Sequence, residues 1–194
     1  EAVYMNHDVR DEARWTEVVD ATEEKYGRLD GLVNNAGVVV IATPQDTTLE
    51  QFRFVNAVMS EGVILGCKAA LPQKLKSGGG SIVNMSSVAT HLGYPVFFAY
   101  SAAKGAVRAM TKSLAVTCQM MKMNIRCNSV HAGAIDTPMI KTANEALGIE
   151  PDPEDPVGIG EPSDVANMIV YLISDESRFV NGAELVIDNA LTVQ

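Results

Sequence analysis

Short apolar runs alternate with longer helical stretches along this chain of 194 residues, and this order constrains the fold more than any other feature. Four of the apolar runs are predicted as strands: residues 29–33, 81–85, 124–130 and 183–187. Strands that are separated by helices pair in parallel and are covered by helices on both faces of the sheet. The sequence therefore predicts one α/β domain over residues 1–194, with a doubly wound, Rossmann-like parallel sheet.

The stretches between the strands carry apolar residues at helical spacing. Helices are expected at residues 11–27, 49–76, 98–121 and 163–173. Pro72 is expected to kink or end the regular part of the second helix. Ser163 is expected to cap the start of the last helix.

Two segments lie outside this alternation. Val3 to Met5 is expected to be the end of a strand, which the polar residues 6–8 close. Residues 151–156 are rich in proline and acid, and we expect an irregular loop there.

The charge of the chain excludes several kinds of partner. A net charge of -9 argues against nucleic acid, because phosphates attract a basic surface. It argues equally against an anionic membrane surface. No apolar run approaches the roughly 20 residues that a membrane span needs, and no signal peptide is visible. A cytoplasmic protein without a nucleic-acid or membrane partner is the expectation.

The three cysteines do not form a metal site. Cys67, Cys118 and Cys127 lack the spacing of metal ligands, and their neighbours are apolar. Buried free thiols in a reducing cytoplasm are therefore expected, and no metal is predicted.

The residues most suited to chemistry are Tyr100 and Lys104. Their spacing places the phenol and the ammonium on one face of a helix, one turn apart. A phenol with a pKa of about 10 is a poor base at neutral pH, and a nearby ammonium favours the phenolate. Ser87 follows a strand, at the edge where open α/β sheets place their ligands. Its hydroxyl could hold the substrate oxygen with which the tyrosine exchanges a proton.

A tyrosine and a lysine at this spacing are most often a surface pair, and the surrounding pattern changes that interpretation. Asn34 to Gly37 follows one strand, Asn56 lies inside a helix, and Asn84 to Ser87 follows the next strand. These motifs follow one another along the chain, and each lies at the end of a predicted strand or inside a predicted helix.

With these motifs the chain resembles the short-chain dehydrogenase/reductase family. It is most similar to the bacterial branch of hydroxysteroid, cyclic-alcohol and (R)-specific secondary-alcohol dehydrogenases. The resemblance runs along the whole chain, and five segments carry it: residues 7–9, 32–37, 81–87, 100–108 and 186–188. It implies an oxidoreductase that moves a hydride between a nicotinamide cofactor and a hydrophobic secondary alcohol or ketone.

The resemblance also assigns catalytic roles. Tyr100 would be the acid/base, and Ser87 would hold the substrate carbonyl; Ser86 fits that role less well. Lys104 would lower the pKa of the tyrosine and bind the nicotinamide ribose. Asn56 would complete a tetrad by holding a water that relays protons towards the lysine.

Further residues are assigned to the cofactor by the same resemblance. Asp8 would accept a hydrogen bond from the adenine amino group, and Val9 would pack on the ring. Cofactor contacts are also expected from Asn34, Ala36, Gly37, Gly133, Ile135 and Thr137. Asn34 is expected to stabilise the sheet more than it touches ligand. NAD is the expected cofactor, with NADP not excluded.

An apolar and aromatic pocket is expected for the substrate. Together with Ser87, its lining would include His91, Tyr94, Phe97 and Met139. His91 and His131 are weaker candidates for the base. A homotetramer is expected by likeness to the family alone.

The chain departs from the family where the pyrophosphate should bind. A glycine-rich loop between a strand and a helix is not found, since residues 78–80 precede a strand and residues 62–66 lie inside a helix. We expect a partial sequence that lacks the family's first strands. Two alternatives stay open: a 3-oxoacyl-carrier-protein reductase of the same family, and a non-catalytic truncated relative.

Overall fold

Four parallel strands form the centre of the molecule. The structure is a computed structural model that describes residues 2–150, 152 and 154–194. Within them the sheet has the order β1-β2-β3-β4, and all three neighbouring pairs are parallel. The strands are β1 (Gly31–Asn34), β2 (Gly80–Met85), β3 (Ile125–Ala132) and β4 (Glu184–Ile187).

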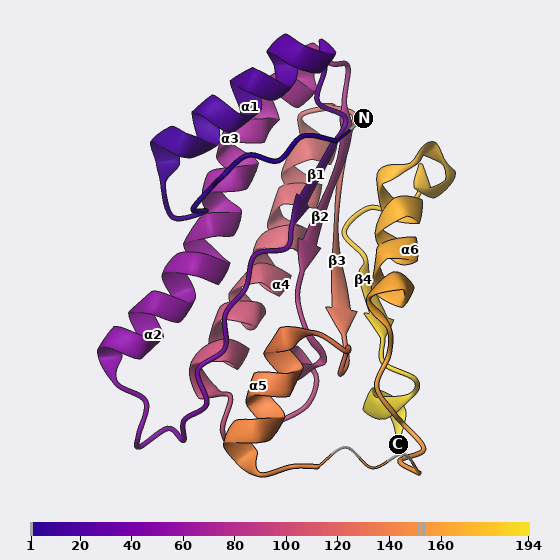
Figure 1. The fold of residues 1–194 in the computed structure, drawn as a ribbon. Coiled ribbons are helices and arrows are strands. Elements are labelled where there is room, and N and C mark those ends of the chain that lie inside the picture. The colour runs from indigo at the N-terminus through magenta and orange to yellow at the C-terminus, as the bar shows by residue number, and fades with distance from the viewer. Residues whose placement is uncertain (1, 151, 153) are drawn as a thin grey trace.

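Helices cover both faces of this sheet, so the predicted α/β class is confirmed (Figure 1). The longer ones are α1 (Glu12–Tyr26), α2 (Leu49–Asn56), α3 (Gly62–Lys76), α4 (Phe98–Met120), α5 (Pro138–Leu147) and α6 (Pro162–Ile173). Helices α3 and α4 pack on one face, and α6 packs on the other. Short segments are the π-helix η1 (Ala57–Glu61) and the 3-10 turns η2 (Val88–Thr90), η3 (Asp175–Ser177) and η4 (Leu191–Val193).

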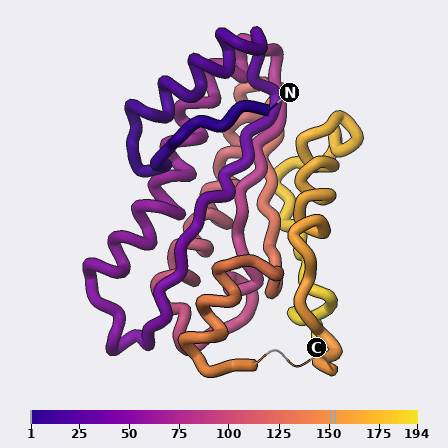
Figure 2. The backbone as a smooth tube through the Cα atoms, viewed as in Figure 1, coloured from indigo at the N-terminus to yellow at the C-terminus, as the bar shows by residue number. Residues whose placement is uncertain are grey.

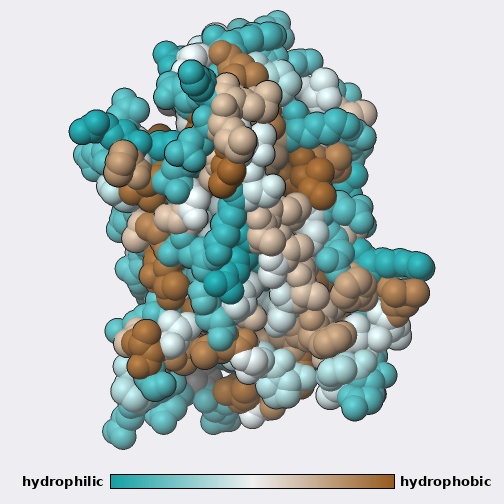
Figure 3. Space-filling model, turned by 180° about the vertical axis from the view of Figure 1, so that it is seen from behind, coloured by the Kyte–Doolittle hydropathy of each residue, from teal (hydrophilic) through white to brown (hydrophobic). Residues whose placement is uncertain are grey.

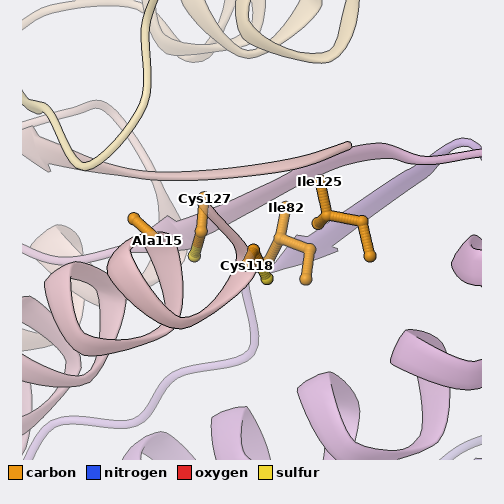
Figure 4. Packing of buried hydrophobic residues seen from close by; sticks show 5 residues of the cluster. All are labelled: Ile82, Ala115, Cys118, Ile125 and Cys127. Carbon is orange, nitrogen blue, oxygen red and sulfur yellow. The ribbon is translucent and has the colours of Figure 1, made fainter. Parts of the chain in front are cut away.

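Successive side chains of β2 point to opposite faces of the sheet, so this strand contributes to the core on both faces. Ile82 points to the α4 side, where it packs in a cluster with Ala115, Cys118, Ile125 and Cys127 (Figure 4). Val83 points to the α6 side and packs with Leu172. All three cysteines are free; Cys118 and Cys127 are buried as expected, and Cys67 is partly buried.

Helix α1 shows why several predicted boundaries hold. The Asp11 side chain accepts a hydrogen bond from the backbone N–H of Arg14, which caps the helix start. Gly27 ends the helix in the left-handed conformation, with φ of 75°, which glycine adopts without strain.

Two local predictions were wrong. Glu161, two residues before Ser163, occupies the N-cap of α6, because Pro162 takes the first helical position. Val3 to Met5 is not a strand, because it pairs with no neighbouring strand among the described residues, and Tyr4 is largely exposed. Pro72, which was expected to kink or end the regular part of its helix, does not end α3, which continues to Lys76. In the loop at 151–156, residues 151 and 153 lie outside the described residues.

The helical run from Leu49 to Lys76 was expected, but its interruption was not. One π-helical turn, Ala57–Glu61, separates α2 from α3. By length and composition alone this run could cross a membrane, with a mean hydropathy of 1.4 over its most apolar window, so the expectation that no run approaches membrane-spanning length was wrong. Half of that window is buried inside the protein, against α1, α4 and the sheet. Core packing therefore accounts for its apolar character.

The chain path brings the predicted functional segments to one end of the molecule. The strand arrows point towards the end where α5 and the C-terminus lie (Figure 1), and the C-terminus lies at the same end of the backbone tube (Figure 2). Loops that follow parallel strands meet at this edge, which is where ligands bind in open α/β sheets.

Candidate active site

Tyr100 and Lys104 lie on α4 where it passes the carboxyl end of β2. The Lys104 side chain is 5% exposed, and its Nζ lies 5.7 Å from the centroid of the Tyr100 ring. The predicted shared helix face is therefore present, and it faces the protein rather than the solvent.

Two contacts fix Lys104 against the strand that precedes the serine loop. Its Nζ donates to the backbone oxygen of Met85 at 2.7 Å. Ser86 Oγ donates to the backbone oxygen of Lys104 at 3.2 Å. Ser86 thus ties α4 to the end of β2, which agrees with its poor fit to a substrate-binding role.

Ser87 lies between the strand and the tyrosine. Its Oγ accepts from the backbone N–H of Ala89 at 3.2 Å, which starts the η2 turn. The Ser87 side chain is also hydrogen-bonded to Tyr100, and this bond favours the phenolate. The structure therefore brings Ser87, Tyr100 and Lys104 together.

The pKa of Tyr100 differs from the expectation. Burial raises it above its ordinary value, and the hydrogen bond with Ser87 only partly opposes that rise. Burial also lowers the pKa of Lys104 to about 8, which still leaves its ammonium as the main form at neutral pH. In this arrangement Tyr100 is a phenol at neutral pH, suited to donate a proton.

Asn56 lies at the junction between α2 and the π-turn. Its Nδ2 donates to the backbone oxygen of Phe52 at 2.9 Å, and its Oδ1 accepts from Ser60 Oγ at 3.1 Å. Ser60 Oγ also lies 3.4 Å from the backbone oxygen of Ala103, one residue before Lys104. Asn56 is thus linked to α4 through Ser60. A π-turn inside a helix often marks a functional position.

Three of the five adenine-side candidates line a cavity of about 190 Å³ beside β1, whereas Asp8 and Gly37 are not part of its lining. Its lining includes Val9, Asn34 and Ala36, together with His7, which had no predicted role. His7 Nε2 is buried and lacks a hydrogen-bond partner among the described residues.

Asp8 and Val9 have different environments. The Asp8 carboxylate is exposed and bonded to Arg10, whose guanidinium holds the pKa of that carboxyl at about 2. Val9 packs on Gly62, where a Cβ would lie 3.0 Å from Val9 Cγ2. Glycine at position 62 therefore allows Val9 to approach the helix.

Asn34 has the sheet-stabilising contacts that were expected of it. Its Nδ2 donates to Asn84 Oδ1 at 2.8 Å, and Asn84 Nδ2 donates to Thr111 Oγ1 at 2.9 Å. This buried chain of amides joins β1, β2 and α4.

The loop after β3 carries the candidates for the nicotinamide end. A Cβ on Gly133 would lie 3.1 Å from Asp188 Cα, so glycine lets this loop pack against the end of β4. Ile135 forms an isolated bridge with Gly160. Thr137 is the N-cap residue of α5, and its Oγ1 donates to the backbone oxygen of Ile135 at 3.2 Å.

Three aromatic rings follow one another towards the tyrosine. The centroids of Tyr94 and Phe97 are 5.6 Å apart, and those of Phe97 and Tyr100 are 6.1 Å apart. The Cε atom of Met139, on α5, would lie 3.7 Å from a Cβ placed on Gly37. Met139, a substrate candidate, therefore lies next to Gly37, a cofactor candidate.

His91 is placed elsewhere than the other substrate candidates. Its Nε2 lies 3.2 Å from His131 Nδ1 and 3.7 Å from Glu184 Oε2. Glu184 in turn binds Arg108 on α4 at 2.8 Å. The sequence analysis missed this group around His131, because its members are far apart in sequence and match no spacing motif.

A doubly wound sheet, with a tyrosine–lysine helix at its carboxyl edge, defines the class of Rossmann-fold oxidoreductases. Comparison with known proteins gives the family. A family model described as "Enoyl-(Acyl carrier protein) reductase" matches residues 1–192. The chain belongs to the short-chain dehydrogenase/reductase family, as its motifs predicted.

Curated relatives include dehydrogenases of several alcohols. The NADP-dependent (R)-specific alcohol dehydrogenase of Lentilactobacillus kefiri is 42% identical over 196 residues, covering 98% of this chain and 77% of the relative. The cyclopentanol dehydrogenase of Comamonas testosteroni is 39% identical over 194 residues, with coverage of 98% and 77%. The 3-beta-hydroxysteroid dehydrogenase of the same organism is 34% identical over 196 residues, again covering 98% and 77%.

Solved structures agree with the fold. Levodione reductase superposes with a TM-score of 0.87 at 32% identity, covering 95% of this chain and 75% of that chain. A short-chain type dehydrogenase/reductase from Mycobacterium marinum superposes with a TM-score of 0.90 at 29% identity, covering 100% and 77%.

Proposed function

We propose that this protein interconverts hydrophobic secondary alcohols and ketones, with Tyr100 as the acid/base. The observation that carries the proposal is the contact between Ser87 and Tyr100 beside the buried Lys104. A carbonyl oxygen held by the Ser87 hydroxyl would lie next to the phenol that donates the proton. The proposal is supported by relatives that are named as dehydrogenases of alcohols and hydroxysteroids.

Each residue of the group has a distinct part in the proposed reaction. In ketone reduction, Tyr100 Oη gives its proton to the substrate oxygen, while Ser87 Oγ donates a hydrogen bond to the same oxygen. In alcohol oxidation, the tyrosine accepts the proton instead. Lys104 would stabilise the phenolate left behind. Asn56 would support proton relay towards the lysine through Ser60 of η1, which contacts α4 at Ala103.

The residues fit a nicotinamide cofactor, which would supply the hydride acceptor or donor when bound. The cavity beside β1 has an unpartnered buried nitrogen, His7 Nε2, and Val9 lies at its wall. We propose that Asp8, Val9, Asn34, Ala36 and Gly37 hold the adenosine end.

For the nicotinamide end we propose Lys104, Tyr100, Gly133, Ile135 and Thr137. NAD remains our proposal for the cofactor. The Lentilactobacillus relative is named NADP-dependent, which makes NADP the alternative that the experiment must include.

A ring-bearing substrate is favoured by the aromatic series Tyr94, Phe97 and Tyr100. Apolar rings bury area against such a wall, whereas a carboxylate would require a basic partner in the pocket. We propose Met139 as the opposite side of this pocket. The position of His91 against His131 makes it the weakest of the substrate candidates.

The test is a turnover assay with NAD and NADP against cyclohexanol, 1-phenylethanol and a 3-hydroxysteroid. Reduced cofactor is followed by its absorbance, in the wild type and in Tyr100→Phe. We expect oxidation of at least one ring alcohol and its loss in the variant. A folded protein that oxidises none of them with either cofactor would contradict the proposal.

A second candidate is reduction of the 3-oxo group of an acyl chain held on acyl carrier protein. It is favoured by the description of the matching family model, which names an enoyl substrate on the same carrier. The net charge of -9 disfavours it, because carrier proteins and phosphopantetheine would meet an acidic surface. Turnover of a 3-oxoacyl thioester with NADPH, exceeding that of any ketone, would establish this candidate.

The assembly and the compartment are proposals by likeness to the family. Hydrophobic areas interrupt the hydrophilic surface on the face seen from behind (Figure 3). Large apolar side chains are exposed on α4 and beyond α6, including Val116, Met120 and Phe179. We propose a cytoplasmic homotetramer, and light scattering of the purified protein tests the oligomeric state.

A further inference from the structure

His131 is fully buried at the end of β3, directly beside the backbone of Ser87. Its Nδ1 lies 3.2 Å from the Ser87 carbonyl oxygen, and its Nε2 lies 2.9 Å from Ser129 Oγ. A carbonyl oxygen can only accept, so we assign the proton to Nδ1. The Ser129 hydroxyl then donates to Nε2, and both ring nitrogens are satisfied.

Thr90 also donates hydrogen bonds to the carbonyl oxygen of Ser87. Its Oγ1 donates to the Ser87 oxygen at 2.8 Å, and its backbone N–H donates to that oxygen at 3.1 Å. Thr90 Oγ1 also lies 3.0 Å from His131 Nδ1. The carbonyl of Ser87 thus accepts from two residues on different elements, η2 and β3.

Charged groups lie next to the hydrogen bonds of His131 and Thr90. Glu184 on β4 faces His91, and its other oxygen is paired with Arg108 and Lys112 of α4. His91, His131 and Glu184 also have the atoms to hold a metal ion. Two cations already neutralise the carboxylate, so a divalent ion would be repelled there. Hydrogen bonding, not metal binding, is the chemistry that fits.

We propose that His131, together with Thr90, is a positioning residue for Ser87. Their hydrogen bonds fix the Ser87 backbone, and thereby the distance from the Ser87 hydroxyl to Tyr100. The inference rests on the proposed function, because it gives the serine and the tyrosine their catalytic meaning. The titratable groups around Tyr100 itself are Lys104 on α4 and Tyr94 on the loop.

This arrangement makes the acidity of Tyr100 depend on a residue that does not touch it. The hydrogen bond with Ser87 lowers the pKa of Tyr100, so displacing Ser87 raises that pKa further. A displacement of about 1 Å at a reacting group can cost about 100-fold in rate. Loss of the His131 donor should therefore affect both turnover and the pH profile.

Two substitutions at His131 separate positioning from packing. In His131→Asn the amide nitrogen can replace Nδ1 as the donor to the Ser87 carbonyl, whereas His131→Leu fills the space without a donor. We expect His131→Leu to lower kcat about 10- to 100-fold, with the cofactor Kd within about threefold. His131→Asn should recover most of kcat. At the second donor, Thr90→Val should behave like the leucine variant, and Thr90→Ser like the wild type.

The titration of Tyr100 is measured in parallel, by NMR of protein labelled at the tyrosine Cζ, with the signal assigned through Tyr100→Phe. We expect a higher midpoint in His131→Leu and Thr90→Val, and an unchanged one in the two conservative variants. Equal titration midpoints in all folded variants, with kcat falling only as the folded fraction falls, would overturn the inference.

This second readout also separates the inference from the proposed function. A wild type that oxidises no alcohol would end the proposed function. The midpoint of Tyr100 in His131→Leu would still decide whether His131 positions Ser87.

Discussion

Lys104 and Met85 are joined by a 2.7 Å hydrogen bond from the ammonium to the backbone oxygen. This bond connects the middle of the site, on α4, to the last residue of β2, two residues before Ser87. The lysine therefore holds in register the two elements that carry the proposed acid/base and its partner.

Tyr100→Phe should lower kcat by about three or more orders of magnitude, because the ring stays in place and only the proton donor is lost. Cofactor Kd should rise only slightly, because the ring stays in place and the proposed ribose contact of Lys104 is kept. Steady-state kinetics and cofactor fluorescence measure the two effects. Tyr94→Phe, on the same aromatic series, is the matched control and should keep most of its activity. A Tyr100→Phe enzyme with a tenth of the wild-type rate would remove this tyrosine from the role.

Lys104→Ala should reduce both turnover and cofactor affinity, because the lysine is proposed to serve Tyr100 and the ribose. It should also destabilise the protein, since the Met85 oxygen loses its buried donor. We expect a loss of about 1–3 kcal/mol in the free energy of unfolding. Titration with cofactor measures the affinity, and an unchanged Kd would contradict the proposed ribose contact.

The rate of alcohol oxidation should rise with pH through the alkaline range. Burial raises the pKa of Tyr100, and oxidation requires the phenolate as proton acceptor. Ketone reduction requires the phenol, so it should be flat at neutral pH and fall only when the phenol ionises. Ser87→Ala should move the oxidation midpoint to higher pH, because the hydrogen bond that lowers the pKa is removed. Rate profiles in both directions provide the measurement; identical midpoints with and without Ser87 would contradict it.

His131 should make stability sensitive to mild acid. Burial lowers the pKa of His131 from 6.5 to about 4 in the folded protein. The unfolded chain therefore takes up a proton first as the pH falls, and stability present above pH 6.5 is lost down to about pH 4. The shift corresponds to about 3 kcal/mol.

Urea unfolding at several pH values within this window measures the effect. His131→Asn should have a shallower dependence on pH than the wild type. Glu184 acts in a lower window, because Arg108 holds the pKa of its carboxyl at about 2. A wild type and variant with parallel pH dependence would show that the histidine is not buried as a neutral group.

Two helical glycines should respond in opposite directions to alanine. At Gly66 a Cβ would lie 2.5 Å from Asn34 Oδ1 and 2.9 Å from Trp15. Gly66→Ala should therefore destabilise the protein by about 2 kcal/mol or more, through overpacking and loss of the amide chain. At Gly105 no atom lies within 4 Å of a Cβ, so Gly105→Ala should stabilise α4 by about 0.5–1 kcal/mol. Denaturant unfolding compares them, and equal effects would contradict the packing around Asn34.

The periodic pattern predicted most of the secondary structure because its signals are local. Asp11 and Gly27 bound α1 through contacts with their own helix, and such contacts can be inferred from adjacent residues. The errors arose where a boundary depends on other parts of the chain. Val3 to Met5 is not a strand, because it has no strand beside it among the described residues. Helix α5 was not predicted, since its sequence was interpreted only as a pocket segment.

The sequence by itself determined the order of the four paired strands, the family, and the pairing of Tyr100 with Lys104, because a helix fixes which residues share a face. Only the tertiary structure decided what surrounds them. Burial raises the pKa of Tyr100, and residues from β3, β4 and η2 meet around the carbonyl of Ser87. Desolvation and hydrogen bonds between distant elements depend on how the layers pack, and no local spacing records them.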